Sequence, residues 1–329
     1  MGALPRLVFM GSDPVALPLL DWLAGDGAAA ATLAGVFTGI DRPSGRGQSV
    51  RPNAVKAWTE GRNLPVFQPE KLDAEAHAAM KALTPDLVLV VAYGRILRED
   101  FIAIPRIGTL NLHASLLPRH RGASPIQTAV AEGDAETGFA LMRIVRELDA
   151  GPVAAVERVA IGPLDTAADV EARLALAAIP LLARTLPLIA RGDIPFIAQD
   201  NDLATFCRLL DKADGVLDFH QPAAALAARI NGLHPWPSVV VDVAGTPVKL
   251  GLAEATGGPH AAPGTITGAD AHGVLVGTGA GLLRLRRLQR AGGRMLDAPE
   301  FLRGFPISPG IVLPSQPMRA LLATSPFRR

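Results

Sequence analysis

The sequence predicts an α/β protein: a doubly wound, Rossmann-like parallel sheet, followed by a small C-terminal β-barrel of the OB-like kind. Three observations predict this. Apolar segments of strand length alternate with helical segments over the first half of the 329 residues. A polar, poorly periodic stretch then intervenes, and short apolar segments separated by glycine turns follow it. We therefore expect an N-terminal domain at 1–190, a linker at 191–207 and a barrel at 208–329.

The alternation in the N-terminal domain can be followed along the chain. "RLVFM" predicts the first strand, and the helix after it begins near Pro14 and ends at Gly25. "LVLVVAYG" is a nearly continuous apolar run, typical of a strand that a parallel sheet buries on both faces. The expected strands are 6–10, 31–39, 87–94, 108–115 and 139–145, and the expected helices are 14–25, 76–83 and 125–133.

The C-terminal part changes character after the stretch "DIPFIAQDNDLATF", which we interpret as linker because it is polar and lacks a helical or strand period. One helix, "PAAALAARINGL", precedes the short strands. Glycine turns separate several of these strands, which favours a small barrel. The expected strands are 238–245, 246–255, 264–269, 273–279 and 281–289.

Composition limits the class of protein. Hydrophobic residues make up 49% and charged residues 19%, so the chain can bury large cores. Cys207 is the only cysteine, which excludes an intrachain disulfide and a cysteine-ligated metal cluster. The first residues show no leader peptide, so we expect a cytoplasmic protein. The apolar segment 174–190 contains Arg184 and two prolines and is expected to be a packed helix, not a membrane span.

Charge is distributed unevenly although the net charge is only +1. Residues 281–329 hold nine arginines against two acidic residues, and residues 41–56 hold three arginines and one lysine against Asp41. Local basic patches of this kind can bind phosphates, although a solvated arginine-rich surface gives the same pattern.

Three polar residues are candidates for catalysis. Side chains alternate along a strand, so Asn111 and His113 share one face of the strand 108–115, near its carboxyl end, where open α/β sheets bind ligands. Asp149 follows the strand 139–145, and if that strand is a neighbour, its carboxylate reaches the same edge. A histidine beside a carboxylate can move protons, and an asparagine amide can donate to an oxyanion.

The same residues also have ordinary structural explanations. A buried histidine is commonly a hydrogen-bonded core residue, and an isolated aspartate is commonly a turn or cap residue. The sequence places no serine or cysteine in a nucleophile elbow and has no His-Glu-x-x-His zinc motif. The chemistry of the residues therefore favours transfer or hydrolysis of an acyl-type group, without a covalent intermediate and without a metal.

Longer motifs add a resemblance to a known family. "LNLHASLLPRHRGASPIQ" (110–127), "DAETG" (134–138) and "LDAG" (148–151) resemble the formyltransferases that use 10-formyltetrahydrofolate. "VFTGIDRPSGRGQSVRPNAVK" (36–56) and "AGGRMLDAPEFLRG" (291–304) resemble the branch of that family whose acceptor is charged initiator tRNA. The resemblance covers nearly the whole chain. It implies transfer of the formyl group to the α-amino group of methionine on that tRNA, for translation initiation.

The resemblance also assigns residues. It implies that Asn111, His113 and Asp149 are catalytic, with no metal. Folate is expected to contact Val91, Tyr93, Gly94, Ile96, Leu97, Ser115, Leu116, Leu117 and Pro118. Charged initiator tRNA is expected to contact Arg42, Gly45, Arg46, Gly47, Arg51, Arg284, Arg286 and Arg287. We expect a monomer with no DNA or membrane partner.

Two alternatives share the same N-terminal domain. One is a formyltransferase that acts on an amino sugar nucleotide, although the basic patches argue against it. The other is a non-catalytic RNA-binding protein on the same scaffold, against which all three catalytic candidates are present. One departure from the family pattern lies beside Asp149, where Gly-Leu-Asp-Thr-Gly-Asp is usual and this chain has Glu147-Leu148-Asp149-Ala150-Gly151-Pro152.

Overall fold

A computed structural model describes residues 4–44 and 49–327 of the chain, with the side chains of 42–44 and 49 left out. By internal packing the chain divides into two units. The first comprises the described residues up to Arg121, with Gly138–Val159 and Ala172–Ala204. The second comprises Gly122–Thr137, Ala160–Glu171 and the described residues from Thr205 onward. Most of the segment 191–207, predicted as linker, therefore packs within the first unit.

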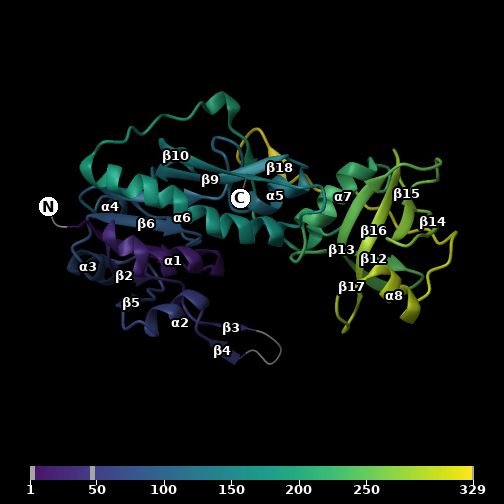
Figure 1. The fold of residues 1–329 in the computed structure, drawn as a ribbon, viewed down its shortest axis with the longest axis horizontal. Helices are drawn as coiled ribbons and strands as arrows, with labels where there is room; N and C mark the ends of the chain where they lie inside the picture. The colour runs from purple at the N-terminus through teal and green to yellow at the C-terminus, as the bar shows by residue number, and fades with distance from the viewer. Residues whose placement is uncertain (1–3, 45–48, 328–329) are drawn as a thin grey trace. The chain divides into compact units, whose positions relative to one another are not determined.

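The first unit is built on one sheet with strand order β10-β9-β7-β6-β1-β2-β5 (Figure 1). The strands β5, β2, β1, β6 and β7 run parallel to one another, as the sequence predicts. The strands are β1 (Arg6–Gly11), β2 (Thr32–Phe37), β5 (Val66–Phe67), β6 (Leu87–Val91), β7 (Gly108–His113), β9 (Glu136–Arg143) and β10 (Val153–Ala160).

The prediction of a wholly parallel sheet is wrong at β9, which pairs antiparallel with β7. His113 lies opposite Ala140, and Leu110 lies opposite Arg143. The apolar pattern of "FALMRIV" could not reveal this, because a strand buried on both faces looks the same in either direction.

Further helices and short strands belong partly to the first unit and partly to the second. Pro14 begins a 3-10 turn that leads into the first helix, and Gly25 is the C-cap of that helix, as predicted. The helices are α1 (Leu17–Ala24), α2 (Ala54–Glu60), α3 (Ala74–Ala82), α4 (Glu99–Ile102), α5 (Pro125–Ala131) and α6 (Ala167–Arg191). The short strands β3 (Arg42–Ser44) and β4 (Ser49–Arg51) pair with each other, and β8 (Arg121–Gly122), β11 (Phe206–Cys207) and β18 (Leu322–Ala323) form a small sheet.

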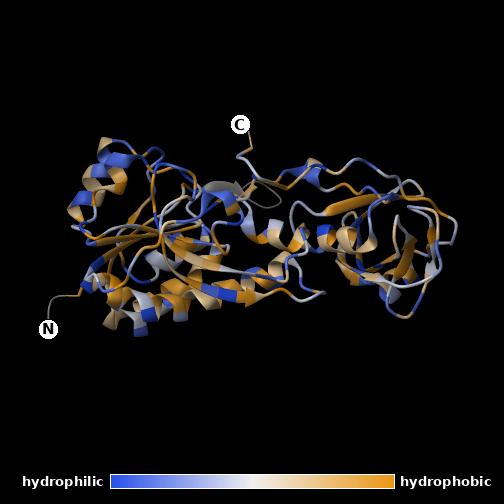
Figure 2. Cartoon of the chain, turned by 90° about the horizontal axis from the view of Figure 1, so that it is seen from above, coloured by the Kyte–Doolittle hydropathy of each residue, from blue (hydrophilic) through white to orange (hydrophobic). Residues whose placement is uncertain are grey.

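The core of the first unit lies against the sheet. All five residues of β6 are buried, in agreement with the prediction from its continuous apolar run. Phe37, Met80 and Phe101 belong to one buried cluster with strand residues of β1 and β6. Figure 2 shows that the strands of this unit are mainly hydrophobic. The sheet is therefore a rigid base on which the ends of its strands can present polar groups.

Helix α6 is long and apolar enough to span a membrane by length and composition alone. Its buried residues recur at helical spacing, as in Leu174, Leu181 and Leu182, while Leu176 is 61% exposed. One buried face and one exposed face are typical of a helix that packs on a protein core, as predicted.

The second unit contains an antiparallel sheet with strand order β12-β13-β16-β15-β14, and β17 pairs with β16 (Figure 1). In β12, buried and exposed residues alternate, so one face of the sheet covers the core. The strands are β12 (Val239–Val243), β13 (Thr246–Thr256), β14 (Ile266–Ala269), β15 (Val274–Gly277), β16 (Leu282–Arg290) and β17 (Leu296–Asp297), with helices α7 (Ala223–Gly232) and α8 (Ala298–Gly304).

The predicted OB-like barrel is not confirmed, because β12 and β14 stand at opposite ends of the strand order and no closed barrel is found in the described residues. Loops cover the two edges instead. Ile266 of β14 exchanges backbone hydrogen bonds of 2.8 Å with Gly310 and Ile311, and Val240 of β12 donates to Gly215 O at 3.2 Å. Covering an edge with a loop satisfies the same unpaired groups as closure does, so the strand pattern alone cannot distinguish the two solutions.

Candidate active site

The candidate site begins at the carboxyl end of β7. Leu110 and Leu112 are buried on one face of the strand, and Asn111 and His113 share the other face, as the period of two requires. His113 is 6% exposed and Asn111 is half-buried. Because β7 is paired on both sides, by β6 and by β9, its backbone is fixed and its side chains are held in place.

One ring nitrogen of His113 is already engaged. Nε2 lies 2.9 Å from the carbonyl oxygen of His120. A carbonyl oxygen can only accept, so Nε2 carries the hydrogen and donates it. The nitrogen that can gain or lose a proton is therefore Nδ1. It faces Asp149, whose Oδ2 is 3.7 Å away.

Asp149 reaches His113 by a route that the sequence did not predict. We expected both residues at one edge because parallel strands end at the same edge. Strand β9 is antiparallel, however, and ends at Arg143, opposite Leu110, beside the amino-terminal half of β7. The residues after Arg143 must therefore return along β7 to bring Asp149 to His113. The predicted association is found, but the reason given for it was wrong.

The returning loop has a constrained backbone. Asp149 has a φ of +48°, in the left-handed region that few residues other than glycine adopt. Gly151 is required where it stands, because a Cβ atom there would lie 1.8 Å from the carbonyl oxygen of Arg143. The hydrogen bond from Arg143 N to Pro152 O, 3.0 Å, closes the loop. The altered residues around Asp149 therefore still form an ordered turn.

The predicted folate-contacting residues lie in two groups. At the end of β6 and just after it, Val91, Tyr93 and Leu97 are buried, whereas Ile96 is 68% exposed. Burial raises the pKa of the Tyr93 hydroxyl. Among the described residues, that hydroxyl is buried without a hydrogen-bond partner. Gly94 adopts a φ of +73°, which places a turn directly after Tyr93.

The second group follows β7. Ser115 is fully buried, and its hydroxyl donates to the carbonyl oxygen of Arg119 at 2.6 Å. This bond closes a turn that leaves Leu116, Leu117 and Pro118 half-buried. The apolar side chains of this turn come shortly after His113 in the chain, so they are available to line a folate site.

The N-terminal tRNA candidates are only partly described. Gly45, Arg46 and Gly47 lie outside the described residues, and Arg42 is described only as backbone in β3. Arg51 is exposed at the end of β4. Lys56, which contributed to the predicted basic patch, lies 2.6 Å from Asp41. One positive charge of that patch is therefore neutralised within the protein.

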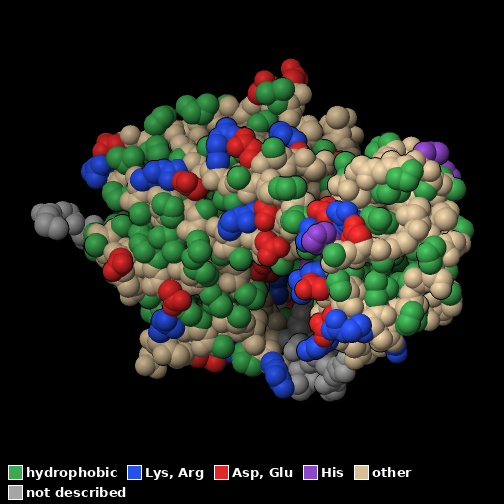
Figure 3. Space-filling view, turned by 45° about the vertical axis from the view of Figure 1, so that its right-hand side comes forward, with side chains coloured by type: hydrophobic (Ala, Val, Ile, Leu, Met, Phe, Trp, Pro, Cys, Tyr) green, Lys and Arg blue, Asp and Glu red, His purple; other side chains and the backbone are tan. Residues whose placement is uncertain are grey.

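The C-terminal tRNA candidates differ from one another in how far their charges are neutralised within the protein. Arg284 contacts Glu254 at 2.8 Å and Asp270 at 2.6 Å, and Arg286 contacts Glu254 at 3.1 Å. Arg287 is 45% exposed and lies 3.5 Å from Asp297. On the face drawn in Figure 3, Lys and Arg side chains stand next to Asp and Glu side chains. The sequence could not show that strand pairing places Glu254 opposite Arg284.

Comparison with known proteins identifies the family. The formyl transferase model matches residues 6–186, and the C-terminal domain model of formyl transferases matches residues 209–306. The methionyl-tRNA formyltransferase of Halorhodospira halophila is 41% identical over 306 residues, which cover 93% of this chain and 98% of that protein. The chain belongs to the methionyl-tRNA formyltransferase family. It is therefore an enzyme of the transferase class.

Solved structures share the fold. WlaRD, a sugar 3N-formyltransferase, aligns with a TM-score of 0.66 at 12% identity, covering 89% of this chain and all of that one. HypX from Aquifex aeolicus, solved with tetrahydrofolic acid, aligns with a TM-score of 0.60 at 16% identity, covering 91% of this chain and 47% of HypX. At such identities the likeness concerns the fold alone. The acceptor substrate is inferred from the methionyl-tRNA formyltransferase relatives, which match both units.

Two polar residues near Asp149 were missed by the sequence reasoning. Arg121, within the recognised motif, is 4% exposed, and Gln199 lies in the segment predicted as linker. The role of Arg121 could have been questioned from the sequence, because an arginine that becomes buried needs partners. No local pattern pointed to Gln199, because its contacts are about 50 and 78 residues away in the chain.

Proposed function

We propose that this enzyme transfers the formyl group of 10-formyltetrahydrofolate to the α-amino group of methionine on charged initiator tRNA. The observation that supports this chemistry is the placement of Nδ1 of His113 3.7 Å from Asp149, with Asn111 on the same face of β7. When bound, 10-formyltetrahydrofolate supplies a formyl group that an amine can attack.

Asn111 is assigned to the formyl oxygen. Its side-chain amide has two N–H donors, and a donor aimed at an oxygen that gains negative charge stabilises the transition state more than the ground state. The half-buried position of Asn111 allows substrate to approach while limiting competition from water. The buried Tyr93 hydroxyl and the apolar side chains Leu97 and Leu116 are compatible with a folate ring that needs both apolar contact and a hydrogen bond.

His113 is assigned to proton transfer at Nδ1. The attacking amine must lose a proton as its bond to the formyl carbon forms, and the departing folate nitrogen must gain one. Nδ1 can accept the first and return it, while Nε2 keeps its bond to His120 O. Asp149 places negative charge beside the nitrogen that becomes positive. At 3.7 Å the carboxylate and Nδ1 are slightly too far apart for a direct hydrogen bond, so in the free protein their interaction is electrostatic.

Charged initiator tRNA is the proposed acceptor. Arg42, Arg46 and Arg51 lie in the segment that resembles the family's tRNA-contacting loop, and Arg287 is the most exposed of the C-terminal candidates. A guanidinium can bind phosphate in a bidentate manner. We assign Arg284 and Arg286 to ion pairs within the sheet instead of to phosphate, because Glu254 and Asp270 already neutralise them.

The test is a formylation assay with two acceptors. Purified protein is incubated with 10-formyltetrahydrofolate and either methionine-charged initiator tRNA or an amino sugar nucleotide, and the formylated product is measured. We expect formyl-methionyl-tRNA and no formyl sugar. Product only with the sugar would support the alternative acceptor, and folate binding without turnover would support a non-catalytic RNA-binding protein.

A further inference from the structure

The side chain of Gln199 connects two parts of the first unit. Its Nε2 donates to the carbonyl oxygens of Asp149 at 2.8 Å and Gly151 at 2.7 Å. Its Oε1 accepts from Arg121 Nε at 3.1 Å and Arg121 Nη2 at 2.8 Å. Carbonyl oxygens only accept and a guanidinium only donates, so the neighbours fix which end of the amide faces which way.

The guanidinium on one side of this amide is a demanding partner. Arg121 is 4% exposed, and a buried charge requires hydrogen bonds. Its Nη2 also donates to Asn201 Oδ1 at 2.9 Å. Burial lowers the pKa of Arg121, and the negative charge of Asp149 acts in the opposite direction. Arg121 and Asp149 therefore influence each other electrostatically, and Gln199 bonds to both residues.

The backbone that carries Gln199 is itself fixed to the sheet. Ile197 and Val153 exchange two backbone hydrogen bonds of 2.8 Å each. The guanidinium of Arg143 lies 4.2 Å from the ring centroid of Phe196. Gln199 thus extends from a segment anchored at the edge strand β10 to the loop that bears Asp149.

We propose that Gln199 is a positioning residue for formyl transfer, which holds the backbone of the Asp149 loop so that the Asp149 carboxylate faces Nδ1 of His113. This inference rests on the proposed function. Asp149 follows a long return from β9 and has a left-handed backbone, so its place depends on bonds such as these. A displacement of about 1 Å near reacting groups can cost about 10²-fold in rate.

The test separates positioning from folding by the substitution Gln199→Glu. The carboxylate keeps an acceptor for Arg121, so the folded state and the melting temperature should be preserved. It removes the donor, however, and turns an oxygen toward the carbonyl oxygens of Asp149 and Gly151. We expect kcat to fall about 10- to 100-fold, with KM for folate and for charged tRNA within about twofold of the wild-type value. Gln316→Glu adds the same charge at an exposed glutamine and should leave both parameters unchanged.

A double-mutant cycle shows whether Gln199 acts through Asp149. In an Asp149→Asn background, Gln199→Glu should lower kcat by less than about twofold, because residues that act as a unit are not additive. Gln199→Leu, which removes both sets of bonds, is measured in parallel in case the glutamate variant does not fold. A folded Gln199 variant with wild-type kcat, or a full additive loss in the cycle, would overturn the inference.

The remaining outcomes also test the positioning role of Gln199. If neither Gln199 variant folds, the residue supports the fold and the positioning role is overturned. If the wild-type enzyme formylates neither acceptor, the proposed function fails and this inference fails with it. If the wild type is active and Gln199→Glu equals it, this inference alone is overturned.

Discussion

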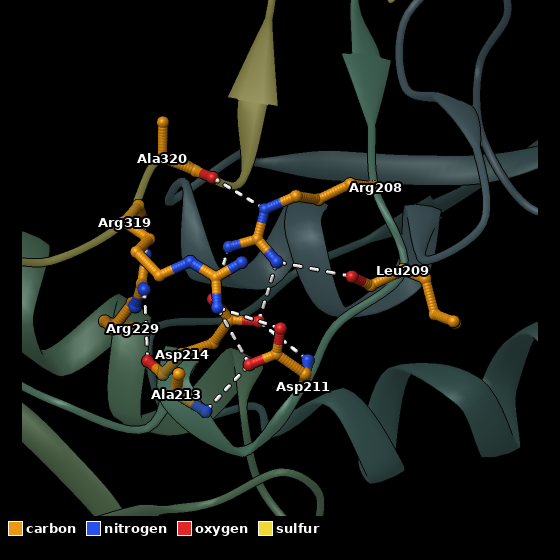
Figure 4. Close-up of polar contacts among 8 residues, drawn as sticks. All are labelled: Arg208, Leu209, Asp211, Ala213, Asp214, Arg229, Arg319 and Ala320. Carbon is orange, nitrogen blue, oxygen red and sulfur yellow. Dashed lines mark hydrogen bonds and ion pairs between the residues drawn. The ribbon is translucent and has the colours of Figure 1, made fainter. Parts of the chain in front are cut away.

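Two arginines with little exposed side-chain surface donate to different kinds of acceptor. Arg121, near the candidate active site, donates to the neutral amide oxygens of Gln199 and Asn201. Arg208, in the second unit, donates to both carboxylate oxygens of Asp214 (Figure 4). Asp214 has no exposed side-chain surface, and Arg319 approaches it to 3.7 Å while binding Asp211 at 2.8 Å.

The charged groups around Asp214 and around Asp149 have different roles. Around Asp214, charges neutralise one another and tie distant segments together, since Arg208 also donates to Ala320 O and Arg229 donates to Arg319 O. Around Asp149, an amide bridges the guanidinium to the backbone of the loop, and the carboxylate lies 3.7 Å from His113 Nδ1. We infer that the Asp214 cluster stabilises the fold and that the Asp149 network positions a charge for reaction.

The largest expected effect concerns the candidate active site around Asp149. His113→Ala should lower kcat by about two to four powers of ten, the range for a lost acid/base residue. Asn111→Ala should lower kcat about 10²-fold, as for a lost oxyanion donor. Steady-state formylation of charged initiator tRNA measures both. Melting temperatures should stay near the wild-type value, and a folded His113→Ala enzyme with normal kcat would remove His113 from the mechanism.

The next prediction concerns the Asp214 cluster, where a substitution should change the stability of the fold. Asp214→Asn leaves Arg208, whose side chain is only 13% exposed, without the carboxylate that it binds, so the free energy of unfolding should fall by about 3–5 kcal/mol. Denaturant unfolding measures this, and kcat per folded molecule should not change. Asp193→Asn is the matched control, because Asp193 pairs with Arg191 at an exposed site, where about 0–1 kcal/mol is expected. Equal losses in both variants would contradict the assignment of Asp214.

The stability effect of Asp214 should also depend on pH. Burial alone would raise the pKa of Asp214, but the hydrogen bonds from Arg208 and from the backbone N–H of Asp211 outweigh it and lower the pKa below the ordinary 3.8. A lowered pKa in the folded state means that the carboxylate stabilises the protein above pH 3.8 and loses this contribution as the pH falls below it. The difference in unfolding free energy between wild type and Asp214→Asn should therefore be constant above about pH 5 and shrink below about pH 4. A difference that grows in acid would show the opposite pKa shift.

The comparison also shows what sequence can reveal. The alternation of Asn111 and His113 with Leu110 and Leu112 follows from the geometry of any strand, so this half of the site was predictable. The direction of β9 was not, because an apolar strand has the same pattern in either direction. Closure of the C-terminal sheet was not predictable either, since an edge can be covered by a loop as at Ile266.

Long-range polar bonds were the least predictable feature. Gln199 lies in a stretch without helical or strand period, and its role depends on where Asp149 and Arg121 arrive in the fold. Strand pairing likewise decides that Arg284 meets Glu254 while Arg287 stays partly exposed. Sequence shows that arginines are clustered, but only their partners show which of them can bind another molecule.

The smallest expected effect tests this distinction between neutralised and available charge on the surface. Arg287 is 45% exposed and only loosely paired, at 3.5 Å from Asp297, whereas Arg284 is 18% exposed and its guanidinium binds Glu254 and Asp270. Hydrogen bonds to Glu254 and Asp270 raise the pKa of Arg284 above its ordinary value, in keeping with this firm pairing.

Arg287→Ala should weaken binding of charged tRNA a few-fold and reduce the slope of log Kd against log salt by about 0.9, the share of one phosphate contact. Arg284→Ala should leave the slope unchanged and lower the melting temperature instead. Kd values measured between about 50 and 200 mM salt decide the matter. If Arg284→Ala reduces the slope as much as Arg287→Ala does, the ion pairs of β16 open when tRNA binds, and partners in the free protein do not show which charges are available.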